Sequence, residues 1–350
     1  MESGKVILLI FQYRQTTFLN SQKFCSNQCE LDFMKDFPMR RFSLSVLATL
    51  ATLAVLGSTA AQAAALGPLI LPADLATTTQ APIILDIRAK GFEQGHIAGA
   101  VSAPYALFRG PAENPGAVPA VAQLEITFER LGLTPLRPVV IVSQGDTDTD
   151  FGAAARVYWT LKSSGFTELA VLNGGAAAWV NAGLPLSTEA VLPVATDLQI
   201  IWNDTWTADT TAVARIVTGE DKATLIDSRP TAFFEGTKAH EAAARAGTLP
   251  GAQSLPYSEF FRPGATAINS DITPASLKTL LGVGQGEPIV SFCNTGHWAA
   301  TDWFAMSEVA GIENVKLYPG SMVEYSQTDG EMANQPGLFR NLFNQLTGGN

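Results

Sequence analysis

Cys293 is the residue whose surroundings in the sequence most clearly suggest chemistry. It follows an apolar, β-favouring run from Ile289 to Phe292 and precedes Asn294-Thr-Gly, a composition typical of a turn rather than of a packed core. With a helix expected from near Ala299, the cysteine would face converging backbone N–H groups and the positive end of the helix dipole, which favour thiolate over thiol. The thiolate is the nucleophilic form, so this pattern indicates a reactive cysteine rather than a buried structural one.

The sequence offers no metal site to assist this cysteine. The histidines His96, His240 and His297 lie far apart, without the spacing of metal ligands. Cys25 and Cys29 are spaced as CxxxC, but they fall in an N-terminal stretch that we do not expect in the mature protein. We therefore predict neither a metal site nor a bound cofactor.

The composition is that of a globular protein with room for two domains. The chain has 350 residues, of which 47% are hydrophobic, and its net charge is -10. Because no basic run and no interleaving of basic and aromatic residues occurs, we expect no nucleic-acid partner. The oligomeric state is left open by these properties.

A secretory signal peptide is predicted at residues 39–63. Met39 is followed by two arginines, residues 42–57 are apolar, and the segment ends in an Ala-Gln-Ala cleavage pattern at Ala63. The apolar run is shorter than the roughly 20 residues of a membrane-spanning helix. We expect cleavage after Ala63, a periplasmic or secreted protein, and no membrane association after cleavage. Residues 1–38 are then an upstream extension or a misassigned start, and the mature chain keeps only Cys293, so that it cannot form an internal disulfide.

The same order of short β-rich runs and longer helical runs occurs twice along the chain. Residues 83–86 and 224–227 are predicted strands that end in aspartate, and each is followed by a Gly-x-x-x-Gly-Ala turn and then by Pro-Tyr. Pro138 and Pro288 precede the next strands, and the segment from Leu172 to Gly175 matches that from Leu317 to Gly320. We infer an internal duplication that gives two α/β domains with parallel sheets.

We place the two domains at residues 66–186 and 206–345, with a linker at 187–205. Counted from the prolines that precede the strands, Ser143 stands in the first repeat where Cys293 stands in the second. The first repeat continues with a longer loop that carries three acids, which would oppose an anionic nucleophile or substrate. No nearby base supports Ser143 as a nucleophile. We therefore predict a catalytically inactive first domain and a catalytic second domain.

From about Leu69 to Phe343, the chain resembles the tandem-domain rhodanese family of the exported bacterial type. The resemblance rests on Asp-Ile-Arg88 and Asp-Ser-Arg229 with their Gly-Ala turns, on the six-residue loop from Cys293 to Trp298, and on the closing Leu-Tyr-Pro-Gly-Ser. It implies two tandem rhodanese-like domains, each a central parallel sheet flanked by helices. It also implies a sulfurtransferase of the thiosulfate or 3-mercaptopyruvate type, in which a donor loads sulfur onto Cys293 as a persulfide and cyanide or a thiol removes it.

The loop after the cysteine suits this chemistry. Backbone N–H groups from Asn294 to Ala299 would stabilise the thiolate and the anionic persulfide, and Gly296 allows a backbone angle that other residues disfavour. Thr295 would add a hydroxyl donor. His297 would add positive charge and Trp298 would shield the persulfide, although outward packing on the rim of the loop is an equally good interpretation for both.

Two arginines are candidates for binding the donor. Arg229 follows the strand-ending Asp227, and here a structural Asp–Arg pair is favoured over donor binding. Arg245 lies in an insertion that the first repeat lacks, and here the alternative to donor binding is an ordinary surface charge. Thiosulfate-using members of the family often carry basic residues just after the cysteine and six residues past the aspartate. Here those places hold Asn294-Thr and Phe233, so the donor is left open.

Other functions fit the sequence less well. A phosphatase of the Cys-loop type needs an arginine that closes the loop, but Ala299 stands six residues after Cys293. A non-catalytic binding protein with this fold is disfavoured by the intact second loop. A periplasmic sulfur carrier, which would pass sulfur to a second protein instead of to a small molecule, is not distinguished from the enzyme by any residue.

Overall fold

The structure is a computed structural model that describes residues 66–284 and 286–337. The predicted signal peptide, the upstream extension with Cys25 and Cys29, and the last residues of the predicted second domain lie outside this range.

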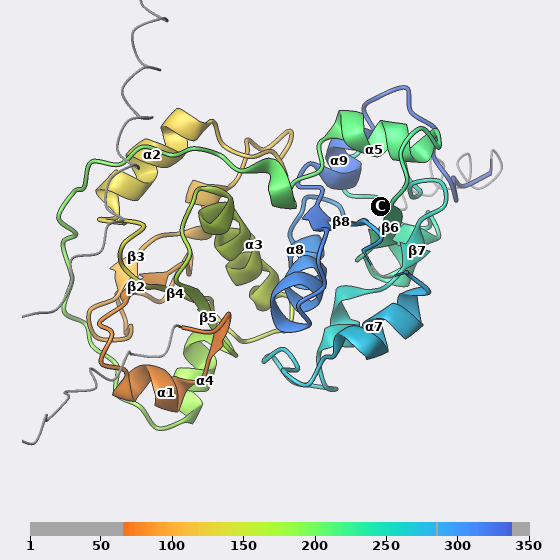
Figure 1. The fold of residues 1–350 in the computed structure, drawn as a ribbon. Helices are drawn as coiled ribbons and strands as arrows, with labels where there is room; N and C mark the ends of the chain where they lie inside the picture. The colour runs from red at the N-terminus through yellow and green to blue at the C-terminus, as the bar shows by residue number, and fades with distance from the viewer. Residues whose placement is uncertain (1–65, 285, 338–350) are drawn as a thin grey trace, which may run out of the picture. The chain divides into compact units, whose positions relative to one another are not determined.

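The first repeat is built on a sheet of five parallel strands (Figure 1). Their order in the sheet is β1-β5-β4-β2-β3. The inner strands β4 and β5 are apolar and buried throughout, as expected for strands with both faces covered. The strands are β1 (Leu69–Ile70), β2 (Ile83–Asp86), β3 (Val101–Ser102), β4 (Val139–Val142) and β5 (Leu169–Leu172).

Helices connect these strands and cover the sheet. Parallel neighbours need a connection that returns the chain to the same end of the sheet, and helices lie in these connections except between β2 and β3, which are joined by turns. The helices are α1 (Pro72–Thr77), the 3₁₀ turn η1 (Tyr105–Phe108), α2 (Val121–Arg130), α3 (Asp150–Ser163) and α4 (Gly175–Asn181).

The second repeat has a parallel sheet of four strands in the order β7-β6-β8-β9. The parallel bridge between Thr207 and Leu317 occupies the place that β1 has beside β5 in the first repeat. The strands are β6 (Thr224–Asp227), β7 (Gln253–Ser254), β8 (Ile289–Phe292) and β9 (Val315–Leu317). The helical segments are η2 (Asp204–Trp206), α5 (Thr210–Val217), α6 (Thr231–Phe234), η3 (Tyr257–Phe260), α7 (Pro274–Leu281), α8 (Trp298–Trp303), its π-helical continuation η4 (Phe304–Val309) and α9 (Ser321–Tyr325).

Two parallel sheets of matching strand order, each flanked by helices, confirm the predicted fold class. The predicted match between Leu317 and Leu172 is wrong by one residue. Leu317 pairs with Ser291 as Val171 pairs with Ile141, so Leu317 corresponds to Val171. The alignment by sequence matches Gly175 to Gly320, because glycine follows both strands. In the structure Gly174-Gly175 of the first repeat corresponds to Gly320-Ser321 of the second.

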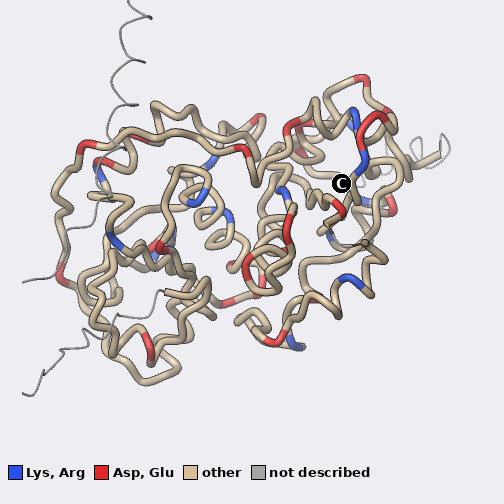
Figure 2. Tube along the Cα trace, in the orientation of Figure 1, with Lys and Arg blue, Asp and Glu red and all other residues tan. Residues whose placement is uncertain are grey.

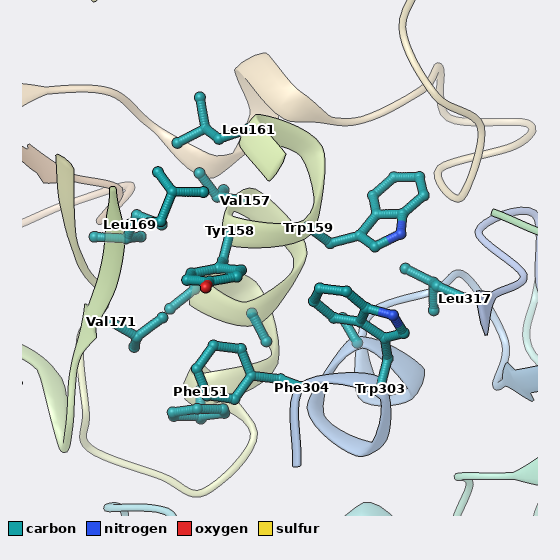
Figure 3. Close-up of a cluster of buried hydrophobic side chains, with 14 of the residues drawn as sticks. Phe151, Val157, Tyr158, Trp159, Leu161, Leu169, Val171, Trp303, Phe304 and Leu317 are labelled. Carbon is teal, nitrogen blue, oxygen red and sulfur yellow. The ribbon is translucent and has the colours of Figure 1, made fainter. Parts of the chain in front are cut away.

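The two repeats meet where α3 packs against α8 and η4. Figure 3 shows the aromatic side chains that fill this contact. Phe304 makes edge contacts with Phe151 and Tyr158, with ring centroids 5.3 and 5.0 Å apart. Trp303 packs against Tyr158 at 6.3 Å, and both Trp303 and Phe304 are fully buried. This contact brings the N-terminal ends of α3 and α8, and with them the loops that precede both helices, close together.

Basic and acidic residues are spread over both repeats and do not gather into one basic stripe (Figure 2). Among the described residues, no helix is both long enough and apolar enough to cross a membrane.

Candidate active site

Cys293 lies directly after the buried strand β8, and only 1% of its surface is exposed. The loop that it opens is held by Ser321, at the start of α9. The Ser321 hydroxyl accepts hydrogen bonds from the backbone N–H groups of Cys293 (3.0 Å) and Gly296 (3.1 Å) and donates to the Tyr318 carbonyl (2.8 Å). The carbonyls of Cys293 and Asn294 accept from the next two N–H groups of α9, so both sides of the loop are fixed.

The remaining N–H groups of the loop are available to an anion. Within the described residues, the backbone N–H groups of Asn294, Thr295, His297 and Trp298 donate to no other protein group. They belong to one tight turn in which Gly296 has a φ of +66°, so they can converge on one point. A thiolate or persulfide at Cys293 is an acceptor of the size and charge that such a turn stabilises.

The corresponding loop of the first repeat lacks both the cysteine and the brace. Ser143 and Gln144 accept the same pair of backbone hydrogen bonds, here from Ala176 and Ala177. Gly175 therefore stands where Ser321 stands in the second repeat, and it has no hydroxyl to hold the loop. The hydroxyl brace therefore distinguishes the loop of Cys293 from the loop of Ser143; that chemistry belongs to the second repeat stays a prediction.

His297 is bound on both ring nitrogens by the first repeat. Nε2 lies 2.9 Å from the Thr149 carbonyl, which can only accept, so Nε2 carries the proton and Nδ1 accepts from the Tyr105 hydroxyl at 3.2 Å. Arg109 in turn donates to that hydroxyl at 3.0 Å. Burial, followed by the charge of Arg109, lowers the pKa of His297 to about 4. At neutral pH the ring is therefore uncharged, contrary to the expectation that it adds positive charge to the loop.

Trp298 joins the loop to both repeats. Its indole N–H donates to the Thr149 hydroxyl at 2.7 Å. The ring stacks on Tyr257 with centroids 5.3 Å apart and planes within 3°, and it meets Phe233 edge-on at 5.9 Å. The loop of the first repeat that carries Thr149 thus packs against the loop of Cys293.

Arg229 is part of a buried ion pair. Its guanidinium lies 2.6 Å from the Asp227 carboxylate, donates to the Gly247 carbonyl, and reaches the Asn294 side chain at 3.3 Å. Arg88 makes the equivalent pair with Asp86 in the first repeat, also at 2.6 Å. Since the Asp–Arg pair and its hydrogen bond to a glycine carbonyl recur in the repeat without a cysteine, these contacts favour the structural role of Arg229 over substrate binding.

Arg245 makes its hydrogen bonds to the segment after α9 and, within the described residues, none to the loop of Cys293. Its guanidinium nitrogens donate to the carbonyls of Ser326, Thr328 and Gly330 at 2.7 to 3.0 Å. With all three nitrogens engaged by one stretch of backbone after α9, Arg245 holds that stretch in place. These contacts favour a structural role rather than a grip on the donor.

The side chains that approach the loop from the first repeat were not predicted from the sequence. The repeat alignment gave one signal: Tyr105 corresponds to Tyr257, and the two tyrosines flank His297 and Trp298. A charged residue in the otherwise apolar centre of α3 gave another, since Arg156 is fully buried between buried neighbours. The residues missed are Tyr105, Arg109, Thr149, Arg156 and Ser321.

Comparisons with known proteins agree with this geometry. A family model for the rhodanese-like domain matches residues 72–182 and again residues 210–328. The chain is 31% identical to a thiosulfate sulfurtransferase of Pseudomonas aeruginosa over 264 residues, which cover 74% of this chain and 94% of that protein. It is 28% identical to the sulfur carrier protein TtuD of Thermus thermophilus over 212 residues, covering 58% of this chain and 73% of that protein.

The crystal structure of SseA from Escherichia coli, a 3-mercaptopyruvate sulfotransferase, has a similar fold. The TM-score is 0.63 at 24% identity, with 73% of this chain and 98% of SseA covered.

Proposed function

Because this chain belongs to the family of rhodanese-like domains, with two copies, we propose that it is a sulfurtransferase in which Cys293 carries sulfur as a persulfide. The sulfur comes from thiosulfate or a related donor such as 3-mercaptopyruvate, and a thiophilic acceptor, cyanide or a thiol, removes it. The observation that carries the proposal is the placement of Cys293 at the start of a braced turn with free N–H groups. Ser143 has no such brace.

In the first half-reaction the Cys293 thiolate attacks the outer sulfur of thiosulfate. A bond forms between Sγ and that sulfur, the sulfur–sulfur bond of thiosulfate breaks, and its electron pair leaves with sulfite. The negative charge ends on the terminal sulfur of the persulfide, where the free N–H groups of the loop stabilise it. Cys293 itself is only 1% exposed, so its Sγ is shielded from bulk water.

In the second half-reaction the acceptor attacks the terminal sulfur. Cyanide forms a carbon–sulfur bond and leaves as thiocyanate, while the electron pair of the persulfide bond returns to Sγ and regenerates the thiolate. Donor and acceptor balance each other in atoms, charge and electrons, so the cycle requires no external oxidant or reductant.

The experiment is thiocyanate formation from cyanide, with thiosulfate and 3-mercaptopyruvate as parallel donors. We expect turnover with at least one donor and none with the Cys293→Ser variant, which keeps the size of the side chain and the fold. The Ser143→Ala variant is the matched control and keeps its activity. Turnover by folded Cys293→Ser would contradict the proposal.

The similarity to a sulfur carrier supports a second candidate, transfer of the persulfide sulfur to another protein. It uses the same Cys293 chemistry and differs only in the acceptor. Loading of Cys293 by a donor without release to cyanide or to small thiols would favour this candidate over the enzyme with a small-molecule acceptor.

We also propose that the protein is exported, on the strength of the sequence pattern at residues 39–63. N-terminal sequencing of the native protein tests this directly. A mature chain that begins immediately after Ala63 is expected, and a chain that retains the apolar run at residues 42–57 would contradict export by this signal.

A further inference from the structure

Two arginines of the first repeat lie beside the loop of Cys293 without an acidic partner. The ion pairs among the described residues include neither Arg109 nor Arg156. Arg109 is half-buried directly after η1, whereas Arg156 is fully buried in α3. A charge that is taken out of water without a counter-charge is costly unless something else compensates for it. The rings of Tyr105 and Trp159 lie 5.1 and 4.9 Å from these guanidinium groups and offset part of that cost, but no acidic side chain pairs with either cation.

Arg156 touches the loop itself. One of its terminal nitrogens donates to the Gly116 carbonyl at 2.9 Å, and the other lies 3.5 Å from the Gly296 carbonyl. Its Nε has no hydrogen-bond partner, although the side chain is fully buried. Burial and then the charge of Arg109 lower the pKa of Arg156 to about 9, which leaves the guanidinium charged at neutral pH.

Arg109 is linked to the loop through Tyr105. It uses one nitrogen for the Tyr105 hydroxyl, and no protein acceptor within the described residues takes its other N–H groups. Tyr105 lies close enough to Arg109, Arg156 and Cys293 for all three to influence its pKa. Arg109 through Tyr105 and His297, and Arg156 through the Gly296 carbonyl, therefore bring two positive charges to the surroundings of the Cys293 loop.

Acids of the first repeat lie nearby, but within the described residues none of them forms an ion pair with Arg109 or Arg156. The Asp150 carboxylate accepts from the N–H groups of Asp146 and Thr147, so it is already engaged within its own loop. At the His297 ring, the charge of Arg109, which lowers the pKa, has a larger effect than the charge of Asp150, which raises it.

The second repeat has no equivalent cations in these places. By the alignment of Tyr105 with Tyr257, Arg109 corresponds to Phe261. The two places where thiosulfate-using relatives are expected to carry a basic residue hold Asn294-Thr and Phe233. At these places an anionic donor meets no basic side chain of the second repeat, whereas Arg109 and Arg156 of the first repeat lie beside the loop without an acidic partner.

We propose that the first repeat supplies an oxyanion-binding subsite for the sulfur donor, in which Arg109 binds the anionic group and the buried Arg156 adds a second positive charge. The chemistry that it recognises is a small oxyanion attached to a transferable sulfur: the sulfonate end of thiosulfate or the carboxylate of 3-mercaptopyruvate. This inference rests on the proposed function. It gives the repeat without a cysteine a direct part in the reaction.

The test is donor binding to full-length protein that carries Cys293→Ser, so that no turnover occurs. Titration calorimetry with thiosulfate and with 3-mercaptopyruvate gives Kd in this background alone and after addition of Arg109→Gln, Arg109→Lys or Arg130→Gln. Arg130 is an exposed arginine of the same repeat and serves as the matched control.

We expect Arg109→Gln to raise Kd about tenfold or more, because a charge-assisted hydrogen bond is lost. Arg109→Lys keeps the charge without the planar fork and should cost about threefold. Arg130→Gln should leave Kd unchanged. Weaker binding of only one of the two donors by the Arg109→Gln variant supports the subsite and identifies the oxyanion that it binds. Equal Kd values for Arg109→Gln and Arg130→Gln, or no donor binding in the Cys293→Ser background, would overturn it.

Arg156 acts as a positioning residue, and its test separates charge from packing. Arg156→Met keeps much of the volume and removes the charge, so thiosulfate binding should weaken while binding of an uncharged thiol acceptor stays the same. A parallel loss of both would mean that Arg156 only shapes the loop. If Arg156→Met does not fold, the Arg109 variants still decide the proposal.

Failure of this inference is distinguishable from failure of the proposed function. Thiocyanate formation that depends on Cys293, together with donor affinity indifferent to Arg109, would sustain the function and remove the subsite. Donor affinity that depends on Arg109, without any sulfur transfer, would sustain the subsite and remove the function.

Discussion

The charge state of His297 is set by its contacts with the first repeat. Its ring is held between the Tyr105 hydroxyl and the Thr149 carbonyl, both from the first repeat. Burial and the positive charge of Arg109 disfavour the protonated ring and lower its pKa to about 4. Its task at neutral pH is therefore to position the loop against the first repeat, not to supply charge.

This lowered pKa predicts a loss of stability in acid. In the unfolded chain a histidine has a pKa of about 6.5, so between pH 6.5 and pH 4 the unfolded state binds a proton that the folded state does not. The free energy of unfolding should fall by roughly 2 kcal/mol from pH 7 to pH 5 on account of this group. Urea denaturation of wild type and His297→Gln at both pH values measures it; the same acid loss in both proteins would contradict the assignment.

The residues of the site divide into those that the sequence reveals and those that it does not. Cys293 and the loop up to Ala299 are consecutive, so strand, turn and helix signals placed them together. Tyr105, Arg109 and Arg156 come from the other repeat, far away in sequence. Their approach to the loop depends on how two folded repeats dock, which local patterns do not encode.

At the scale of elements, the loop between β8 and α8 owes its shape to α9. The Ser321 hydroxyl accepts hydrogen bonds from two N–H groups of the loop. Gly296 is enclosed by both repeats: a Cβ there would lie 2.4 Å from Arg156 Nη1 of the first and 2.5 Å from the Pro319 carbonyl of the second. Both contacts fix the direction of the remaining N–H groups of the loop.

Gly296→Ala should therefore do more than strain one backbone angle. Gly251 has a similar φ of +75°, but open space around its Cβ position, and it serves as the matched control. Each substitution should cost roughly 1–2 kcal/mol of stability from the left-handed angle. Only Gly296→Ala should also lower kcat/KM by about 100-fold, through displacement of the loop. Equal activities of the two variants would contradict the role of the loop geometry.

The elements themselves were largely predictable because their signals are local. Apolar runs that end in aspartate became β2 and β6, and the apolar runs after Pro138 and Pro288 became β4 and β8. The hydrogen bonds from the loop to Ser321 were not predictable. A serine in a turn looks the same in the sequence whether or not its hydroxyl accepts hydrogen bonds from a loop distant along the chain. The misalignment of Leu317 with Leu172 concealed the contrast between Ser321 and Gly175.

At the scale of the whole chain, the site depends on the contact between the repeats. Phe304 and Trp303 from the second repeat pack with Phe151 and Tyr158 of the first (Figure 3), and all four are buried. The same contact sets the loop of Cys293 against Tyr105 and Arg109. Packing and chemistry are therefore coupled through α3 and α8.

Truncation of this contact should lower both stability and activity. Phe304→Ala removes a fully buried ring and should cost about 3–5 kcal/mol of unfolding free energy. Leu280→Ala, at a leucine that is 63% exposed, should change it by less than about 0.5 kcal/mol. Chemical denaturation followed by tryptophan fluorescence compares the two. A Phe304→Ala protein as stable as Leu280→Ala would show that the repeats do not rely on each other.

The duplication and the α/β class were readable from the sequence, because each repeat carries its own apolar pattern. The docking of the repeats was not, since α3 and α8 are apolar around most of their surface and no local signal states which face meets the other helix. The position of Arg109 and Arg156 beside the loop follows from this docking and not from the sequence around either arginine.

The persulfide on Cys293 is the central claim, and mass spectrometry tests it most directly. Full-length protein is incubated with thiosulfate, freed of the donor and digested, and the peptide that contains Cys293 is weighed before and after addition of cyanide. We predict a gain of one sulfur atom on that peptide, its loss on addition of cyanide, and the appearance of thiocyanate in equal amount. Thiocyanate formation while Cys293 stays unmodified, or a sulfur that cyanide does not remove, would contradict the mechanism.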